Sequence, residues 1–285
     1  MQNFTFSTSA TKETTVKRLL ADFGVSHRLF KRLLDSGSIK LEGKKTGNVT
    51  VHPGQSVTFT LIQDKAVTPS SGHLDVVFEN ANWLVVNKPA GLSSVPGPAN
   101  PEDSLLNRAA GYLVDAGFAG AQPAIITRLD RDTVGLVLIA KHAFAQGRLD
   151  QLGPAAKLDK YYLALVSGVL PETSGAIIKP LGAAPDGIHQ EVRADGKIAR
   201  TNYKVVRRGQ QTTLVELHLL TGRTHQIRVH MASILHPLVG DALYGGPTDR
   251  LTGQALIAAR LEFADPFTGE QIKVSLPWPK FWAVV

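Results

Sequence analysis

The chain has 285 residues, with 31 Lys and Arg against 24 Asp and Glu, so its formal net charge is +7. It contains no cysteine, which excludes disulfides and thiolate metal sites, and its positive charge favours an anionic partner such as nucleic acid. It has no apolar run that would span a bilayer and no secretory pattern at its start, so we expect a cytoplasmic protein without a membrane partner.

Much of the positive charge lies near the N-terminus. Residues 1–65 hold ten Lys and Arg and five Asp and Glu, a net charge of +5. We therefore predict a small basic α/β module over residues 1–66. VTPSSG then breaks the pattern and predicts a linker at 67–72, followed by a second domain over 73–285.

The basic module is predicted to contain two short helices. The first is expected to end at Gly24, and the second to begin with Ser26 as its N-cap and to end at Gly37. Two strands follow. The predicted helices cover 14–23 and 26–37, and the predicted strands cover 38–45 and 56–61.

One side of the second helix is basic. At 100° per residue, Arg28, Lys31 and Arg32 share one side, opposite Phe30 and Leu33. The apolar side predicts burial. The basic side predicts contact with a phosphate backbone, although a solvated charged face is an equally good interpretation.

The second domain is rich in strand patterns. Strands are predicted over 74–79, 83–88, 135–141, 161–168, 213–220, 255–263 and 271–276, and helices over 104–113, 142–152 and 224–233. Strands and helices do not alternate strictly, so we predict an α+β fold with a largely antiparallel sheet.

The segment ITRLDRDTVGLVLIAK places one carboxylate in a basic setting. Asp130 lies between Arg128 and Arg131, just before an apolar run that predicts a rigid strand. This arrangement indicates a nucleophile presented to an anionic polymer. A surface charge cluster is the alternative, because such clusters are common in loops.

Three further segments carry candidate groups. In NKPAGLSS, Lys88 precedes a turn. Tyr161 and Tyr162 begin a strand, so one ring faces the core and the other faces away, and either ring stacks on a base or packs in the core. In LLTGRTHQIRVH, Arg223 begins a helix, where it is placed to pair with a carboxylate from another loop or to form a structural ion pair.

Together these segments resemble the RluA family of RNA pseudouridine synthases. VVNKPAGL, TRLDRDTVGLVLIAK, KYYLALVSG and LTGRTHQIRVHMASILHPLVGDALYGG follow the order of the family's four motifs. The resemblance covers nearly all of residues 73–285. Residues 1–65 resemble, less closely, the S4-like RNA-binding module of RluC- and RluD-like members.

The resemblance implies a role for several residues. Asp130 matches the catalytic aspartate, and Tyr162 matches the aromatic residue that stacks on the uracil and assists proton movement. Arg223 matches the arginine that pairs with the aspartate, and Arg128 matches the side chain that enters the RNA as the uridine leaves. Further RNA contacts are expected from Lys88, Arg28, Lys31, Arg32, His225, Gln226 and Arg228.

The chain departs from the family pattern at two positions. Thr127 stands where His is usual, and Val134 stands where Ser is usual. Because neither position carries the carboxylate, we expect changed RNA contacts or loop packing rather than lost activity.

We therefore expect a monomeric, cofactor-free enzyme that isomerises uridines in structured RNA, with 23S ribosomal RNA as the target or transfer RNA as the alternative. The nine histidines show no metal-ligand spacing, and no metal site is predicted. Two other classes stay open. Asp130-Arg131-Asp132-Thr133 resembles the D-x-D-x-T loop of Mg²⁺-dependent phosphatases with one residue missing, and an inactive synthase domain would be a non-catalytic RNA-binding protein.

Overall fold

The computed structural model describes residues 2–62, 67–98, 100–119, 121–153, 158–249, 251 and 253–278. The predicted boundary at residue 66 lies outside the described residues. Within them, no helix is long and apolar enough to cross a membrane.

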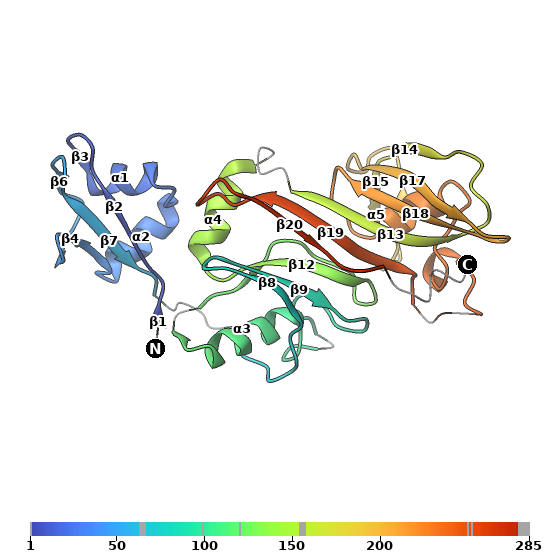
Figure 1. Cartoon of the computed structure of the whole chain (residues 1–285), viewed down its shortest axis with the longest axis horizontal. Coiled ribbons are helices and arrows are strands. Elements are labelled where there is room, and N and C mark those ends of the chain that lie inside the picture. The colour runs from blue at the N-terminus through green and yellow to red at the C-terminus, as the bar shows by residue number, and fades with distance from the viewer. Residues whose placement is uncertain are drawn as a thin grey trace.

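The N-terminal part has its own sheet and two helices at one end of the molecule (Figure 1). The antiparallel sheet runs in the order β2-β7-β4-β5. Its strands are β2 (Thr5–Ser9), β7 (Ser56–Thr60), β4 (Ile39–Leu41) and β5 (Lys44–Lys45), and its helices are α1 (Val16–Asp22) and α2 (His27–Asp35). The two short pairs are β3 (Thr14–Thr15) with β6 (Thr50–Val51) and β1 (Gln2–Asn3) with β10 (Phe118–Ala119).

Both predicted helices are present, with shorter ends. The Thr15 hydroxyl accepts a hydrogen bond from the Arg18 amide, so Thr15 caps α1 instead of belonging to it. Ser26 caps α2 in the same way, as predicted. The strand β2 was not predicted from the sequence.

A ten-stranded sheet forms the larger part of the molecule. Its main path is β14-β17-β18-β13-β19-β12-β9-β8, with β11 beside β12 and β20 beside β19. The pairing of β12 with β19 is parallel, and every other pairing in this sheet is antiparallel. The α+β fold with a mostly antiparallel sheet is thereby confirmed.

The predicted strands correspond to β8 (Val76–Glu79), β9 (Trp83–Lys88), β12 (Val134–Ala140), β13 (Asp159–Ser167), β18 (Thr212–Leu219), β19 (Leu256–Ala264) and β20 (Gln271–Ser275). The predicted helices correspond to α3 (Leu105–Asp115), α4 (Ala143–Leu152) and α5 (Gln226–Ala232). The sequence did not predict β11 (Ala124–Ile125), β14 (Ser174–Ile178), β15 (Leu181–Ala183), β16 (Gln190–Val192) or β17 (Arg200–Arg208).

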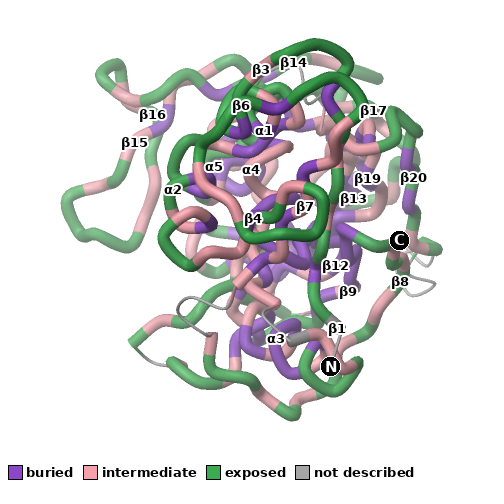
Figure 2. Tube along the Cα trace, turned by 90° about the vertical axis from the view of Figure 1, so that its left-hand side faces the viewer, coloured by how far each residue is buried: buried purple, intermediate pink, exposed green. Residues whose placement is uncertain are grey.

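Aromatic side chains join the N-terminal part to the large sheet's helices. Phe144 of α4 belongs to the same buried cluster as Phe59 of β7, with ring centroids 5.3 Å apart. Arg148 of α4 donates hydrogen bonds to the carbonyls of Phe23 and Pro266. The buried strands β9 and β12 lie in the interior of the other, larger core (Figure 2).

Residues 67–72 run along α3. The Ser70 amide donates to the Asn107 carbonyl at 3.0 Å, and the Asn107 side chain donates to the Thr68 carbonyl at 2.8 Å. Gly111 makes this contact possible, since a Cβ there would lie 2.0 Å from the Ser70 carbonyl oxygen. The segment predicted as a linker therefore contacts α3 through Thr68 and Ser70.

Candidate active site

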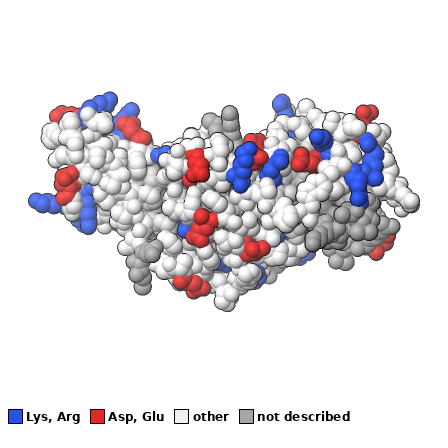
Figure 3. Space-filling model, in the orientation of Figure 1, with Lys and Arg blue, Asp and Glu red and all other residues white. Residues whose placement is uncertain are grey.

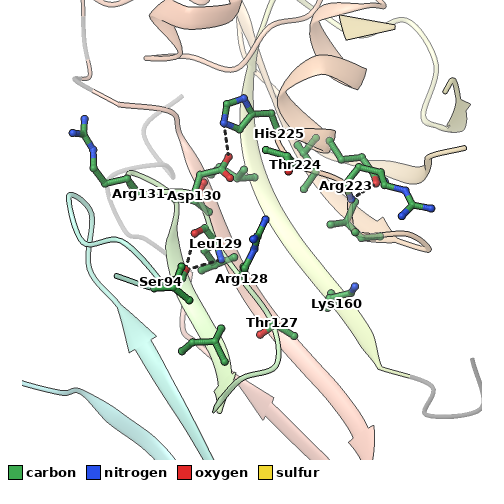
Figure 4. Close-up of a pocket in the computed structure, with 18 of the residues that line it drawn as sticks. Ser94, Thr127, Arg128, Leu129, Asp130, Arg131, Lys160, Arg223, Thr224 and His225 are labelled. Atoms are coloured by element: carbon green, nitrogen blue, oxygen red, sulfur yellow. Dashed lines mark hydrogen bonds and ion pairs between the residues drawn. The ribbon is translucent and has the colours of Figure 1, made fainter. Parts of the chain in front are cut away.

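A cavity of about 610 Å³ lies beside the segment that contains Asp130 (Figure 4). We call residues 126–133, between β11 and β12, the Asp130 loop. The opposite walls come from β13, from the end of β18 and from the start of α5. The lining residues that the sequence had singled out are Thr127, Arg128, Asp130, Tyr162, Arg223, His225, Gln226 and Arg228.

Alternate residues of the Asp130 loop are anchored to the protein. The Thr127 hydroxyl accepts from the Leu138 amide at 2.9 Å. The Leu129 carbonyl accepts from the Ser94 hydroxyl at 2.7 Å, and the Leu129 amide donates to the same hydroxyl at 3.0 Å. Because these anchors occupy every second residue, Arg128, between them, has an exposed side chain that lines the cavity.

An arginine and a histidine face the carboxylate of Asp130, whose side chain is 27% exposed. Nη1 of Arg228 lies 3.4 Å from Oδ2, and Nε2 of His225 lies 3.9 Å from the same oxygen. Arg228 also donates from Nε and Nη2 to the buried carboxylate of Asp241, at 2.7 Å each. One guanidinium thus bridges two carboxylates.

Arg228 has a raised pKa in this setting. Burial acts to lower the pKa, but the hydrogen bonds and charge of Asp241 and the charge of Asp130 outweigh it. The guanidinium is therefore a fixed positive charge beside Asp130.

Arg223 does not make the pairing expected of it. Its Nε donates to the Ile198 carbonyl at 3.2 Å, and its amide donates to the side chain of Gln226. Figure 4 shows its side chain directed away from Asp130. The reason is the start of α5: Arg223 lies before the helix, whereas Arg228 lies on the turn that faces the Asp130 loop.

The two adjacent tyrosines face opposite sides of the sheet. Tyr162 is buried at the cavity wall, and burial, with the charge of Asp130, raises the pKa of its phenol. Tyr161 stacks on His218 with centroids 4.4 Å apart, and the Arg260 guanidinium lies 3.8 Å from its ring centroid. Tyr162 is therefore the ring available to a base in the cavity.

The chain matches a known family over the segment that contains this cavity. Residues 82–233 match the family model described as RNA pseudouridylate synthase. The chain belongs to the RNA pseudouridylate synthase family. It is an RluA-type RNA pseudouridine synthase, an isomerase, so the phosphatase and non-catalytic alternatives are set aside.

Relatives match the synthase over most of its length. An RNA pseudouridine synthase of Bacillus subtilis, YjbO, is 34% identical over 93% of this chain and 96% of its own. Ribosomal large subunit pseudouridine synthase D of Xanthomonas campestris is 36% identical over 87% of this chain and 80% of its own. The structure of human RNA pseudouridylate synthase domain containing 1 covers 74% of this chain and 85% of its own, with 27% identity and a TM-score of 0.61.

Lys88, which was expected to contact RNA, is buried inside the synthase. Its side chain is 0% exposed, and Nζ donates to the carbonyls of Pro89, Leu92 and Arg131 at 2.9, 2.8 and 2.7 Å. Burial lowers the pKa of this ammonium to about 8. Lys88 therefore holds the Asp130 loop through the Arg131 carbonyl, and all three of its N–H groups donate to carbonyls of the protein.

Gln226 and Arg228 were also expected to contact RNA, and both are buried. The Gln226 amide donates to the Arg200 carbonyl and the Thr201 hydroxyl, at 3.0 Å each. It holds the start of α5 against β17. The nitrogens of Arg228 bond to carboxylates instead of facing solvent. Both residues line the cavity, and an RNA contact by either stays a prediction.

The basic side of α2 is only partly exposed. Arg28 and Lys31 are exposed, whereas Arg32 is half-buried in a small crevice beside Leu29 and Ala143. Lys and Arg side chains are visible at the end of the molecule where the N-terminal part lies (Figure 3). An RNA contact by Arg28 and Lys31 stays a prediction.

Sequence reasoning missed four residues that build the site. They are Ser94, Asp241, Tyr244 and Gln254, whose side chain donates to the Thr133 hydroxyl at 2.9 Å. Asp241 and Tyr244 lie within the GDALYGG segment already noted, where an acid and a phenol after the helix that carries Arg228 are the available signal. Ser94 ends the NKPAGLSS segment already noted, whereas Gln254 lies outside every segment that the sequence singled out.

Proposed function

We propose that the synthase converts specific uridines of large-subunit ribosomal RNA to pseudouridine, with Asp130 as the reacting carboxylate. The observation that carries this proposal is the partly exposed Asp130 carboxylate in a cavity, paired with Arg228 and facing Tyr162. The Xanthomonas relative, named for the large ribosomal subunit, supports the choice of RNA, and transfer RNA is the alternative.

The reaction rearranges bonds within one nucleotide. The N1–C1′ bond breaks, the base turns, and C5 bonds to C1′; C5 then loses its proton and N1 gains one. Asp130 either attacks the nucleotide or removes a ribose proton, and the neighbouring guanidinium of Arg228 complements its negative charge in both cases. Tyr162, with its raised pKa, stays a neutral phenol that can assist the proton movement.

The target uridine must leave its stack to reach Asp130. That step costs a few kcal/mol, and stacking on Tyr162 offsets about 1–3 kcal/mol of it. Arg128, which is exposed on the Asp130 loop and lines the cavity, would fill the gap in the RNA. The N-terminal part, as an S4-like module, would hold flanking phosphates through Arg28 and Lys31.

The Asp130→Asn substitution tests the role of the carboxylate. We expect pseudouridine formation to be abolished while RNA binding is largely kept, because the amide is isosteric but neither ionised nor nucleophilic. Asp132→Asn is the matched control, since Asp132 is also partly exposed but pairs with Arg131 at 3.3 Å. A normal rate for Asp130→Asn would show that another group carries the reaction.

Mapping pseudouridines in total RNA, from cells with and without the synthase, tests the target. We expect a site in large-subunit ribosomal RNA to lose its pseudouridine. A loss confined to transfer RNA would favour the alternative target, and no loss in either RNA would contradict the proposed activity.

A further inference from the structure

Tyr244 contacts both His225 and Arg228, the two partners of Asp130. It ends the short 3₁₀ helix Ala242–Tyr244 that follows Asp241. Its hydroxyl lies 2.8 Å from Nδ1 of His225, and its ring centroid lies 4.9 Å from the Arg228 guanidinium carbon. Tyr244 is thus connected to Asp130 in two ways, once through His225 and once through Arg228.

A hairpin holds Tyr244 from the other side. The strands β15 and β16 are joined by residues 184–189 and stand out from the body of the molecule (Figure 2). The Gln190 amide donates to the Tyr244 hydroxyl at 2.9 Å. His189 packs edge-on to the Tyr244 ring at 5.7 Å, and its Nε2 bonds to the Leu243 carbonyl at 3.1 Å.

These contacts favour one direction for the hydrogen bond between Tyr244 and His225. A backbone amide such as that of Gln190 can only donate, so the Tyr244 oxygen accepts there. The hydroxyl keeps one proton to donate, and among the described residues Nδ1 of His225, 2.8 Å away, is the acceptor in reach of it. A neutral imidazole with an unprotonated Nδ1 carries its proton on Nε2, the atom that lies 3.9 Å from Asp130.

The backbone of His225 is held in an uncommon conformation. Its φ of 53° lies in the left-handed region, which costs a side-chain-bearing residue about 1–2 kcal/mol. This conformation places the ring between Tyr244 and Asp130 instead of using it to cap α5. Burial lowers the pKa of His225, which favours the neutral ring that the hydrogen bonds require.

We propose that Tyr244 is a positioning residue that fixes the tautomer of His225, so that Nε2–H is presented to the carboxylate of Asp130. The hairpin β15–β16 keeps Tyr244 in place through Gln190. Hydrogen bonds in catalytic sites are often long without substrate and shorten in the complex, so the 3.9 Å separation is suited to this role. The inference rests on the proposed function of Asp130.

Tyr244→Phe removes the hydroxyl and keeps the ring over Arg228. We expect kcat to fall about tenfold, as for the loss of one hydrogen bond, with KM nearly unchanged. Tyr112→Phe is the control, because it removes a phenol bonded to Glu79 on another surface and should leave kcat within about twofold. His225→Gln, which keeps a side-chain N–H donor, should retain more activity than His225→Leu.

Nitrogen NMR of ¹⁵N-histidine-labelled protein gives a readout that a purely structural role would not change. His225, identified by the signal lost in His225→Gln, should be the Nε2–H tautomer in the wild type and a mixture of tautomers in Tyr244→Phe. An Nδ1–H or doubly protonated His225 in the wild type at assay pH would overturn the proposal, as would a Tyr244→Phe variant changed only in KM. Failure of Asp130→Asn to stop the reaction would instead refute the role of Asp130 and leave the tautomer result standing.

Discussion

Two groups of basic residues in this synthase differ in what their nitrogen atoms contact. On α2, Arg28 and Lys31 are exposed. Around the Asp130 loop, Lys88 and Arg228 are buried, and their N–H groups bond to carbonyl and carboxylate oxygens of the protein. A buried cation can shape a site without touching the substrate, whereas an exposed cation is free for phosphate. A basic residue within a motif therefore does not by itself indicate an RNA contact.

Among substitutions of these basic residues, the largest effect should come from Arg228→Lys. A lysine keeps the charge but cannot bond both oxygens of Asp241 and reach Asp130 as the guanidinium does. We expect kcat to fall about 100-fold and the unfolding free energy to fall by about 3 kcal/mol. Steady-state kinetics and denaturant unfolding measure the two effects. If Arg223→Lys instead gave the weaker enzyme, the pairing first expected for Arg223 would be restored.

Lys88→Met should act on stability and on the Asp130 loop, not on RNA affinity. Three carbonyls lose a buried donor, and we expect the unfolding free energy to fall by about 3 kcal/mol. The exposed Lys31→Met is the control, with a change below about 0.5 kcal/mol. A drop in RNA affinity without a drop in stability would show that Lys88 does reach the RNA.

The double variant Arg28→Gln, Lys31→Gln should have the opposite profile. We expect an unchanged free energy of unfolding and weaker RNA binding. The slope of log affinity against log salt concentration should be shallower by about two. Arg18→Gln is the control, because the Arg18 side chain is exposed but pairs with Asp22 at 3.1 Å. An unchanged salt slope would mean that this side of α2 is only a solvated charged face.

The ion pair between Arg108 and Asp103, which is only partly exposed, should give the smallest effect on stability. Hydrogen bonds from Arg108 and Ser70 lower the pKa of Asp103 to about 2 from its ordinary 3.8. Because the folded-state value is the lower one, the stabilisation is present above the ordinary pKa and is lost as pH falls through about 2. Asp103 is 43% exposed, so we expect Asp103→Asn to cost less than about 1 kcal/mol near neutral pH. That difference from the wild type, measured by denaturant unfolding, should shrink below about pH 4; a constant difference would argue against the pair.

The strands with strong apolar patterns were predicted, and those without them were missed. β9 and β12 are almost wholly buried, and their sequences WLVVNK and VGLVLIA show it. β17, RTNYKVVRR, has one buried position and four basic residues, so its pattern resembles a loop. β14 and β17 are held by pairing at the end of the sheet, and such pairing leaves little trace in composition.

Several residues that line the cavity were predicted from the sequence, but the contact that each one makes was not. Motif order indicated Asp130, Tyr162 and Arg223 as one constellation. The arginine that pairs with Asp130 is Arg228, because α5 begins at Gln226 and its first turn decides which side chain faces the Asp130 loop. Helix ends shift by a residue or two with local capping, which a pattern does not resolve.

The sequence by itself determined the family, the α+β class and the carboxylate at the centre of the site, since these depend on residue identities in a fixed order. Only the tertiary structure decided which basic side chains bond to oxygens of the protein and which are exposed to solvent, because burial and hydrogen bonding depend on neighbours far apart in the chain. Lys88 meets Arg131 across 43 residues, and Arg228 meets Asp130 across 98. Those contacts turn a charged loop into a positioned carboxylate.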